Sequence, residues 1–161
     1  MVKILLVLGI FFNGVSSESG MSGKIVGVAD GNTVEVTTDA NAHFRIALLG
    51  IDCPELGQDF GVEAKEFVEK RLLGKDVTIK IHGKDRSGDY VGIVLLNDGI
   101  DIRLDLLKHG LAWTTEKNPI AELEILRLQA VTTREGLWRS ENPTPPWIYR
   151  RQQSMAAPKS Q

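Results

Sequence analysis

Three short runs of strand-forming residues follow one another closely near the start of the chain. They are Lys24–Val28, Thr33–Thr37 and Phe44–Leu49, and only an Asp-Gly turn and a short polar segment separate them. Runs of this length, rich in β-branched residues and bounded by turn-forming residues, predict β-strands. Connections this short join antiparallel neighbours. We therefore predict three consecutive antiparallel strands.

The middle of the chain predicts three helices and two further strands. Gly61–Leu73 carries apolar residues on one helical face and stops before Gly74. Asn118 and Pro119 suit the start of a helix that runs to about Glu135, since they offer a capping side chain and a first-turn proline. The other predicted elements are strands at Val77–Ile81 and Tyr90–Leu96 and a helix at Leu104–His109.

Five short strands with three helices predict an α+β fold dominated by a five-stranded β-barrel of the OB type. Barrels of this type bind oligonucleotides and oligosaccharides on one face. The chain has 161 residues, which suit one domain. We place this domain at residues 23–151 and a flexible tail at residues 152–161.

The segment after Pro143 is proline-rich and then polar, and the sequence predicts no helix there. Trp147 and Tyr149 stand beside Arg150 and Arg151. Two interpretations are open: a patch that stacks on bases and binds phosphate, or a tail that packs back onto the barrel.

Residues 1–17 have the pattern of a signal peptide. Lys3 precedes an apolar run too short to span a membrane, and small residues lead to a cleavage site at Ser17/Glu18. Cleavage there leaves a linker at residues 18–22. We therefore expect an exported protein, periplasmic or secreted, with no stable membrane insertion once the leader is removed.

The charge balance argues against a strong polyanion-binding protein. The chain carries a formal net charge of −2, and removing a leader with one lysine and no acid leaves −3. Phosphate contacts supply most nucleic-acid affinity, so binding here requires a local basic patch. The single cysteine, Cys53, cannot form an internal disulfide, and we expect a buried thiol and a monomer.

An apolar strand leads directly into an Asp-x-Pro-Glu turn at Asp52–Glu55. Pro54 fixes its own φ and pushes Cys53 into an extended conformation. The two carboxylates are therefore held in one repeatable geometry, suited to binding a hard cation and orienting a water molecule. The alternative is a proline-containing turn with solvated acids.

Five other segments accompany this turn. They are Ala29–Val36, Gly61–Val68, Leu107–Ala112, Glu135–Trp138 and Pro145–Trp147. In this order and spacing they resemble the staphylococcal nuclease (thermonuclease) family, over roughly Gly23 to Arg151. The resemblance implies an OB-type barrel and calcium-dependent hydrolysis of DNA and RNA.

The metal and base positions of that family are partly retained. The resemblance makes Asp52 and the backbone carbonyl of Cys53 calcium ligands, and Glu55 the residue that handles the attacking water. Asn32 stands where the family has a second metal-binding aspartate. Its amide oxygen still suits calcium, but losing one negative charge weakens the site.

The two phosphate-clamping arginines of the family are replaced, by Ala47 and Asp89. Arg45 lies two residues before Ala47, on the same face of the predicted strand, and is a possible substitute. Arg86 occupies the loop where the family places a phosphate-contacting lysine, and it suits bidentate phosphate binding. The alternative for both is a solvated surface arginine.

These replacements lead to three functional hypotheses. The first is an exported nuclease-like protein that has lost most or all phosphodiester hydrolysis and is retained for binding nucleic acid or nucleotides. The second is a working calcium-dependent endonuclease in which Arg45 and Arg86 stand in. The third is a protein-interaction module, which suits the acidic net charge.

Overall fold

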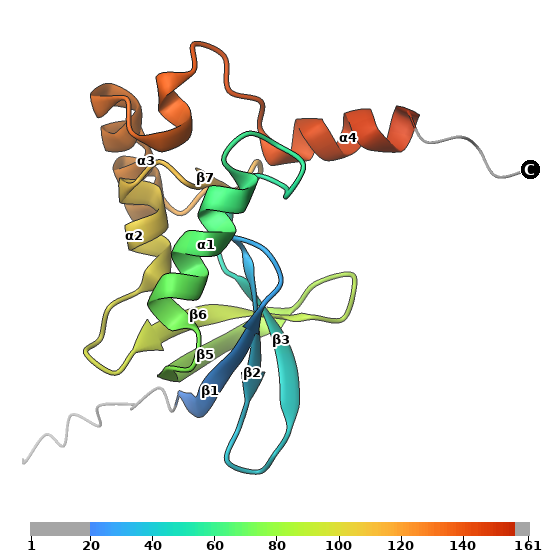
Figure 1. The fold of residues 1–161 in the computed structure, drawn as a ribbon, viewed down its shortest axis with the longest axis vertical. Coiled ribbons are helices and arrows are strands. Elements are labelled where there is room, and N and C mark those ends of the chain that lie inside the picture. The colour runs from blue at the N-terminus through green and yellow to red at the C-terminus, as the bar shows by residue number, and fades with distance from the viewer. Residues whose placement is uncertain (1–19, 157–161) are drawn as a thin grey trace, which may run out of the picture.

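The computed structural model describes residues 20–156, and five of its strands close into a barrel (Figure 1). Around the barrel the order is β1-β2-β3-β6-β5. Four of the five pairings are antiparallel, and β3 and β6 close the barrel in parallel. The strands are β1 (Met21–Val28), β2 (Thr33–Thr37), β3 (His43–Leu48), β5 (Asp76–Lys84) and β6 (Tyr90–Leu96).

Alternation along the strands sets which side chains enter the barrel. In β2, Val34 and Val36 are buried and Glu35 points outward; in β3, Ile46 and Leu48 are buried. Irregularities in the register of β1 and β5 bend those strands, as closure requires. The predicted five-stranded barrel is therefore confirmed.

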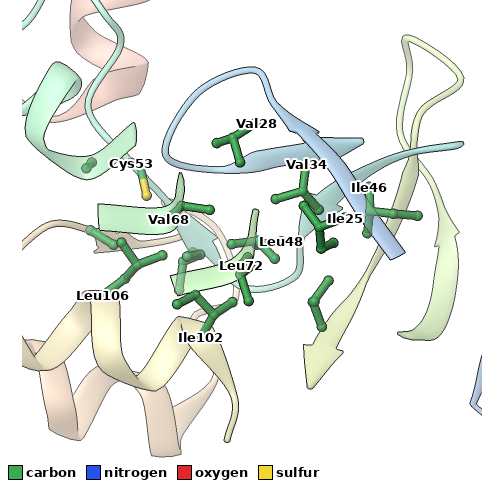
Figure 2. Packing of buried hydrophobic residues seen from close by; sticks show 14 of the residues in the cluster. Ile25, Val28, Val34, Ile46, Leu48, Cys53, Val68, Leu72, Ile102 and Leu106 are labelled. Atoms are coloured by element: carbon green, nitrogen blue, oxygen red, sulfur yellow. The ribbon is translucent and has the colours of Figure 1, made fainter. Parts of the chain in front are cut away.

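The helices cover one end of the barrel. Ala64, Val68 and Leu72 form the buried face of α1, and Ile102 and Leu106 project from α2 into the same core. Figure 2 shows these helix residues meeting buried strand residues. The helices are α1 (Gly61–Leu72), α2 (Ile102–Lys108), α3 (Ala121–Thr133), a 3₁₀ helix η1 (Gly136–Arg139) and α4 (Pro146–Ala156).

Two predictions about the helices were wrong. The helix expected at Asn118-Pro119 begins at Ala121, because Asn118 adopts a left-handed turn conformation and Ile120 precedes the helix without a side-chain cap. The segment after Pro143 also contains α4, which brings the number of α-helices to four within residues 20–156. Pro146 is its first residue, a position that proline favours.

A two-residue ladder ties the end of the barrel to the segment after α2. β4 (Ile51–Asp52) pairs with β7 (Trp113–Thr114), and Asp52 lies opposite Trp113. This pairing fixes the backbone of Asp52 directly beside the helical end of the molecule.

The predicted signal peptide at residues 1–17 lies outside the described residues, as does the end of the tail. Among residues 20–156, no helix has the length and apolar character needed to cross a bilayer.

Candidate functional site

The turn between β1 and β2 packs directly on the Asp-x-Pro-Glu loop. The Cys53 thiol donates a hydrogen bond to the Gly31 carbonyl oxygen at 3.1 Å. A Cβ added at Gly31 would lie 2.7 Å from the Cβ of Ala64 and 2.9 Å from that of Cys53, so a side chain does not fit. Burial, followed by the charges of Asp52, Asp30 and Glu55, raises the pKa of the Cys53 thiol well above its usual value.

Asn32 is fixed within that turn. Its backbone N–H donates to the Asp30 carboxylate at 2.7 Å, and its carbonyl accepts from the Leu48 N–H at 2.8 Å. The side-chain oxygen Oδ1 is buried and has no hydrogen-bond partner among the described residues. A buried polar atom without a partner is costly. This oxygen therefore has acceptor capacity that no described residue uses.

The loop that carries Glu55 is held from both sides. The Glu55 backbone N–H donates to the Gln58 side-chain oxygen at 2.9 Å, and the Gln58 amide donates to the Thr144 carbonyl at 3.0 Å. Gln58 thus joins this loop to the segment that leads into α4. Beside it lies a cleft of about 260 Å³, whose lining includes Gln58, Trp113 and Tyr149.

Asp52 and Glu55 share one partner, Arg150 of α4. Its two terminal nitrogens meet the two Asp52 oxygens at 3.1 and 2.8 Å, and one of them also contacts Glu55 Oε1 at 2.6 Å. The side chains are 49% exposed for Arg150, 17% for Asp52 and 38% for Glu55. These contacts raise the pKa of the Arg150 guanidinium, the hydrogen bond to Asp52 contributing most.

Aromatic contacts hold α4 in this position. The Trp147 ring lies 5.6 Å from that of Trp113, and the Tyr149 hydroxyl donates to the Gly57 carbonyl at 3.1 Å. Arg151 pairs with Glu116 at 2.6 Å. Of the two interpretations left open for this segment, packing onto the body of the protein is therefore what the structure shows. In Figure 1, α4 lies next to the loop that precedes α1.

A different ion pair joins β3 to the turn before β6. Arg45 Nε lies 3.3 Å from Asp89 Oδ2, with side chains 51% and 28% exposed. The pairing of β3 with β6 explains this contact, because it places Ile46 opposite Tyr90, the residue after Asp89. Ala47 follows on the same outer face of β3 and carries no charge.

Arg45 and Arg86 therefore differ in their surroundings. Arg45 is held by Asp89, and neither Asp52 nor Glu55 contacts it within the described structure. Arg86 is exposed in the β5–β6 turn and makes no hydrogen bond or ion pair with any residue from 20 to 156. The structure thus brings Asp52 and Glu55 together with Arg150, a residue that was not singled out as their partner. The sequence feature that could have indicated it is the arginine pair Arg150-Arg151, which follows Pro145-Pro146-Trp147 closely.

The oxygen donors predicted for a metal ion from the sequence differ in charge. Residues 20–156 contain no cluster of three or more His, Cys, Asp or Glu side chains suited to a metal. Asp52, the Asn32 amide and the Cys53 carbonyl offer one carboxylate and two neutral oxygens, a set that a hard cation accepts. The unpartnered Asn32 oxygen fits this role.

Comparison with known proteins assigns the chain to a family. Residues 45–140, more than half of the chain, match the family described as staphylococcal nuclease homologue. The chain belongs to the staphylococcal nuclease family. Neither Asn32 nor Arg150 falls within the matched residues.

Individual relatives of the staphylococcal nuclease family agree with this assignment. An "Uncharacterized endonuclease" of Escherichia coli is 36% identical over 129 residues, covering 80% of this chain and 84% of the relative. One of Haemophilus influenzae with the same description is 29% identical and covers 82% of this chain and 74% of the relative. The "Probable staphylococcal-like nuclease CAN1" of rice is 38% identical over 109 residues, 67% of this chain but 33% of that protein.

Proposed function

We propose that this protein binds nucleic acid or nucleotides and has lost most or all of the phosphodiester hydrolysis of its family. The observation that carries the proposal is the Arg45–Asp89 ion pair. Asp89 stands where the family resemblance places an arginine, and it neutralises the arginine on β3 nearest to the other replaced position, Ala47. This pair by itself offers a phosphate no net positive charge.

The expected effect on the rate is large. Hydrolysis of a phosphodiester requires donors aimed at the charge that develops in the transition state, and losing one such donor costs roughly two to three orders of magnitude. Losing two costs on the order of four orders of magnitude or more if the effects add, although neighbouring groups often do not add. Asn32 in place of an aspartate removes a further negative charge from the metal ligands.

The remaining residues support binding. A calcium ion, when bound, would neutralise phosphate oxygens. Asp52, the Asn32 amide and the Cys53 carbonyl are the groups proposed to hold it, and Glu55 is the group that could orient a water molecule. The cleft beside Gln58 has aromatic side chains in its lining and includes Pro54, which lies between Cys53 and Glu55 in the chain, and it offers space for the neutral part of a nucleotide.

One observation favours a second candidate, a working calcium-dependent endonuclease. The buried Asn32 oxygen has no partner within the described structure, as expected of a ligand kept for a cation. Arg45 or Arg86 would then take part in hydrolysis.

A digestion experiment separates the two candidates. Labelled single-stranded DNA and RNA are incubated with the purified protein, with calcium and with a chelator, beside a Glu55→Gln control. Our proposal expects no calcium-dependent cleavage at high protein concentration, or cleavage orders of magnitude slower than that of the Escherichia coli relative under the same conditions. Rapid calcium-dependent cleavage that the Glu55 variant lacks would establish the endonuclease instead.

A binding measurement tests the other half of the proposal. Fluorescence anisotropy of a labelled oligonucleotide, at low salt where electrostatic binding is strongest, should rise with protein concentration. Absence of binding there would overturn the proposal and favour the protein-interaction module.

We also propose that the protein is exported after cleavage near Ser17/Glu18. The basic and apolar pattern of residues 1–17 supports this. Amino-terminal sequencing of the protein recovered outside the cytoplasm should begin at or near Glu18, and recovery of the intact chain from the cytoplasm alone would contradict it.

A further inference from the structure

Within the described structure, Arg150 is the residue whose guanidinium contacts both Asp52 and Glu55. Its guanidinium engages both oxygens of Asp52 and one of Glu55, and about half of its side chain is exposed. An exposed arginine with a long side chain can exchange partners without any movement of its helix. The Arg150 side chain can therefore leave Asp52 and Glu55 and bind another partner.

The sum of the charges at the site indicates when Arg150 would leave Asp52. Asp52, Glu55 and Arg150 together carry one net negative charge, with both acids ionised. A divalent cation on Asp52 makes this sum positive by one and repels the guanidinium from the Asp52 oxygens. One phosphodiester group then brings the sum to zero. Without Arg150, the same assembly would keep a net negative charge and disfavour the phosphate.

We propose that Arg150 is the phosphate-binding residue of this site, held on Asp52 and Glu55 until a divalent cation takes Asp52. The proposal rests on the proposed nucleic-acid binding and names the residue that achieves it. The planar guanidinium suits a phosphodiester because it can donate two parallel hydrogen bonds to its oxygens. In this protein the C-terminal helix thus supplies the positive charge that Ala47 and Asp89 no longer supply.

Other arginines are less suited to this role. Arg45 pairs with Asp89 and Arg151 with Glu116, and within the described structure none of Arg45, Arg151 and Arg86 contacts Asp52 or Glu55. The helix can stay docked while the Arg150 side chain moves, because Trp147 and Tyr149 make its contacts with the rest of the protein.

The test uses two ligands whose affinities should change in opposite directions. Arg150→Gln removes the charge and keeps much of the side-chain length, and Arg151→Gln, the neighbouring arginine, is the matched control. Calcium affinity is measured by calorimetry, and binding of labelled single-stranded oligothymidylate by anisotropy in saturating calcium. Thermal unfolding of each variant verifies that it is folded.

We expect Arg150→Gln to bind calcium several-fold more tightly and oligothymidylate about tenfold more weakly, because a competitor for Asp52 and a charged phosphate donor are both lost. Arg150→Lys should restore part of the oligonucleotide affinity, and Arg151→Gln should leave both affinities near those of the wild type. A purely structural anchor would not produce opposite changes.

The outcomes that overturn the inference are distinct. If the wild type binds oligothymidylate and Arg150→Gln binds it equally well, Arg150 does not contact phosphate, while the proposed function stands. If calcium and oligonucleotide affinities both fall, Arg150 serves only to organise the site. If the wild type binds no oligonucleotide, the proposed function fails, and the inference fails with it.

Discussion

Two arginine–carboxylate contacts involve candidate site residues, and they differ in the elements that supply their side chains. Arg45 and Asp89 come from the barrel and its turn and meet at 3.3 Å through exposed side chains. Arg150 comes from a helix at the end of the described chain and meets Asp52 and Glu55 through three hydrogen bonds, with Asp52 largely buried. The first contact removes a positive charge from the barrel edge, whereas the second brings one to the carboxylates.

The energies of the two contacts should also differ. Exposed ion pairs contribute about 0.2–1 kcal/mol at most, and many contribute nothing measurable. A bidentate arginine with a partly buried acceptor is stronger and more specific in geometry, although exposure of the guanidinium reduces its value. The barrel contact therefore matters mainly for charge, and the helix contact for both charge and position.

The largest effect should come from restoring charge at the barrel edge. Ala47→Arg combined with Asp89→Arg places two guanidinium groups where the sequence resemblance to the family implies them and removes the partner of Arg45. Because each positioned donor is worth roughly two orders of magnitude or more, we expect cleavage of single-stranded DNA in calcium to accelerate at least about a hundredfold. Initial rates measure this. The same pair combined with Glu55→Gln should stay slow, and no acceleration would show that the barrel edge does not limit the rate.

The reactivity of Cys53, which lies between Asp52 and Glu55 in the chain, measures how rigid their loop is. Burial and the neighbouring carboxylates raise the pKa of its thiol, so the thiolate is scarce at neutral pH. Alkylation of the native protein near pH 8 should be slower than that of the unfolded chain by about two orders of magnitude or more. Mass spectrometry after timed quenching follows the reaction, and rapid native alkylation would reveal a loop that opens readily.

The same pKa shift gives a direction for stability. A thiol whose pKa is higher in the folded protein contributes stability fully below its unfolded pKa and loses that contribution as the pH rises toward the folded value. The free energy of unfolding should therefore fall above about pH 8.5, the usual thiol range. Denaturant titrations at rising pH measure the slope, and Cys53→Ala should remove this component of it.

Trp147→Ala should weaken the packing of α4 on the rest of the protein and leave the Arg45–Asp89 contact of the barrel intact. The substitution removes the ring contact with Trp113, and we expect a loss of about 1–3 kcal/mol, confined to α4. Hydrogen exchange should accelerate in α4 and stay unchanged in β2 and β3. Uniform acceleration would mean that α4 unfolds only together with the barrel.

The smallest effect is expected for Arg45→Ala. Because this arginine is half exposed and its ion pair in the described part of the chain is with the partly buried Asp89, the free energy of unfolding should change by less than about 0.5 kcal/mol. Any residual cleavage should be unaffected. Loss of cleavage in this variant would instead show that Arg45 leaves Asp89 and takes part in hydrolysis.

The elements that were predicted correctly have local signals. Strand-forming runs bounded by turn residues located β2 and β6 at their observed bounds, and apolar spacing with a terminal glycine located α1 to within one residue. The α4 segment lacks such a signal, because it is polar on most of its surface and follows prolines that resemble a terminating tail. Its stability comes from contacts such as that between Trp147 and Trp113, which are distant in sequence.

The site was predicted one residue at a time, and its pairings were not. Asp52, Glu55, Arg45 and Asp89 were each singled out from the sequence. The Arg45–Asp89 contact depends on the parallel register of β3 with β6, and that of Arg150 with Asp52 joins positions 98 apart. No local pattern encodes either contact, because both arise from how distant elements pack.

The position of α4 at the end of the described chain has a consequence for biosynthesis. All five barrel strands and the helices as far as η1 leave the ribosome before Pro146 does. Domains begin to fold during synthesis, from the amino-terminal side. Asp52 and Glu55 therefore leave the ribosome well before their guanidinium partner does, and only the docking of the last helix brings Arg150 to them.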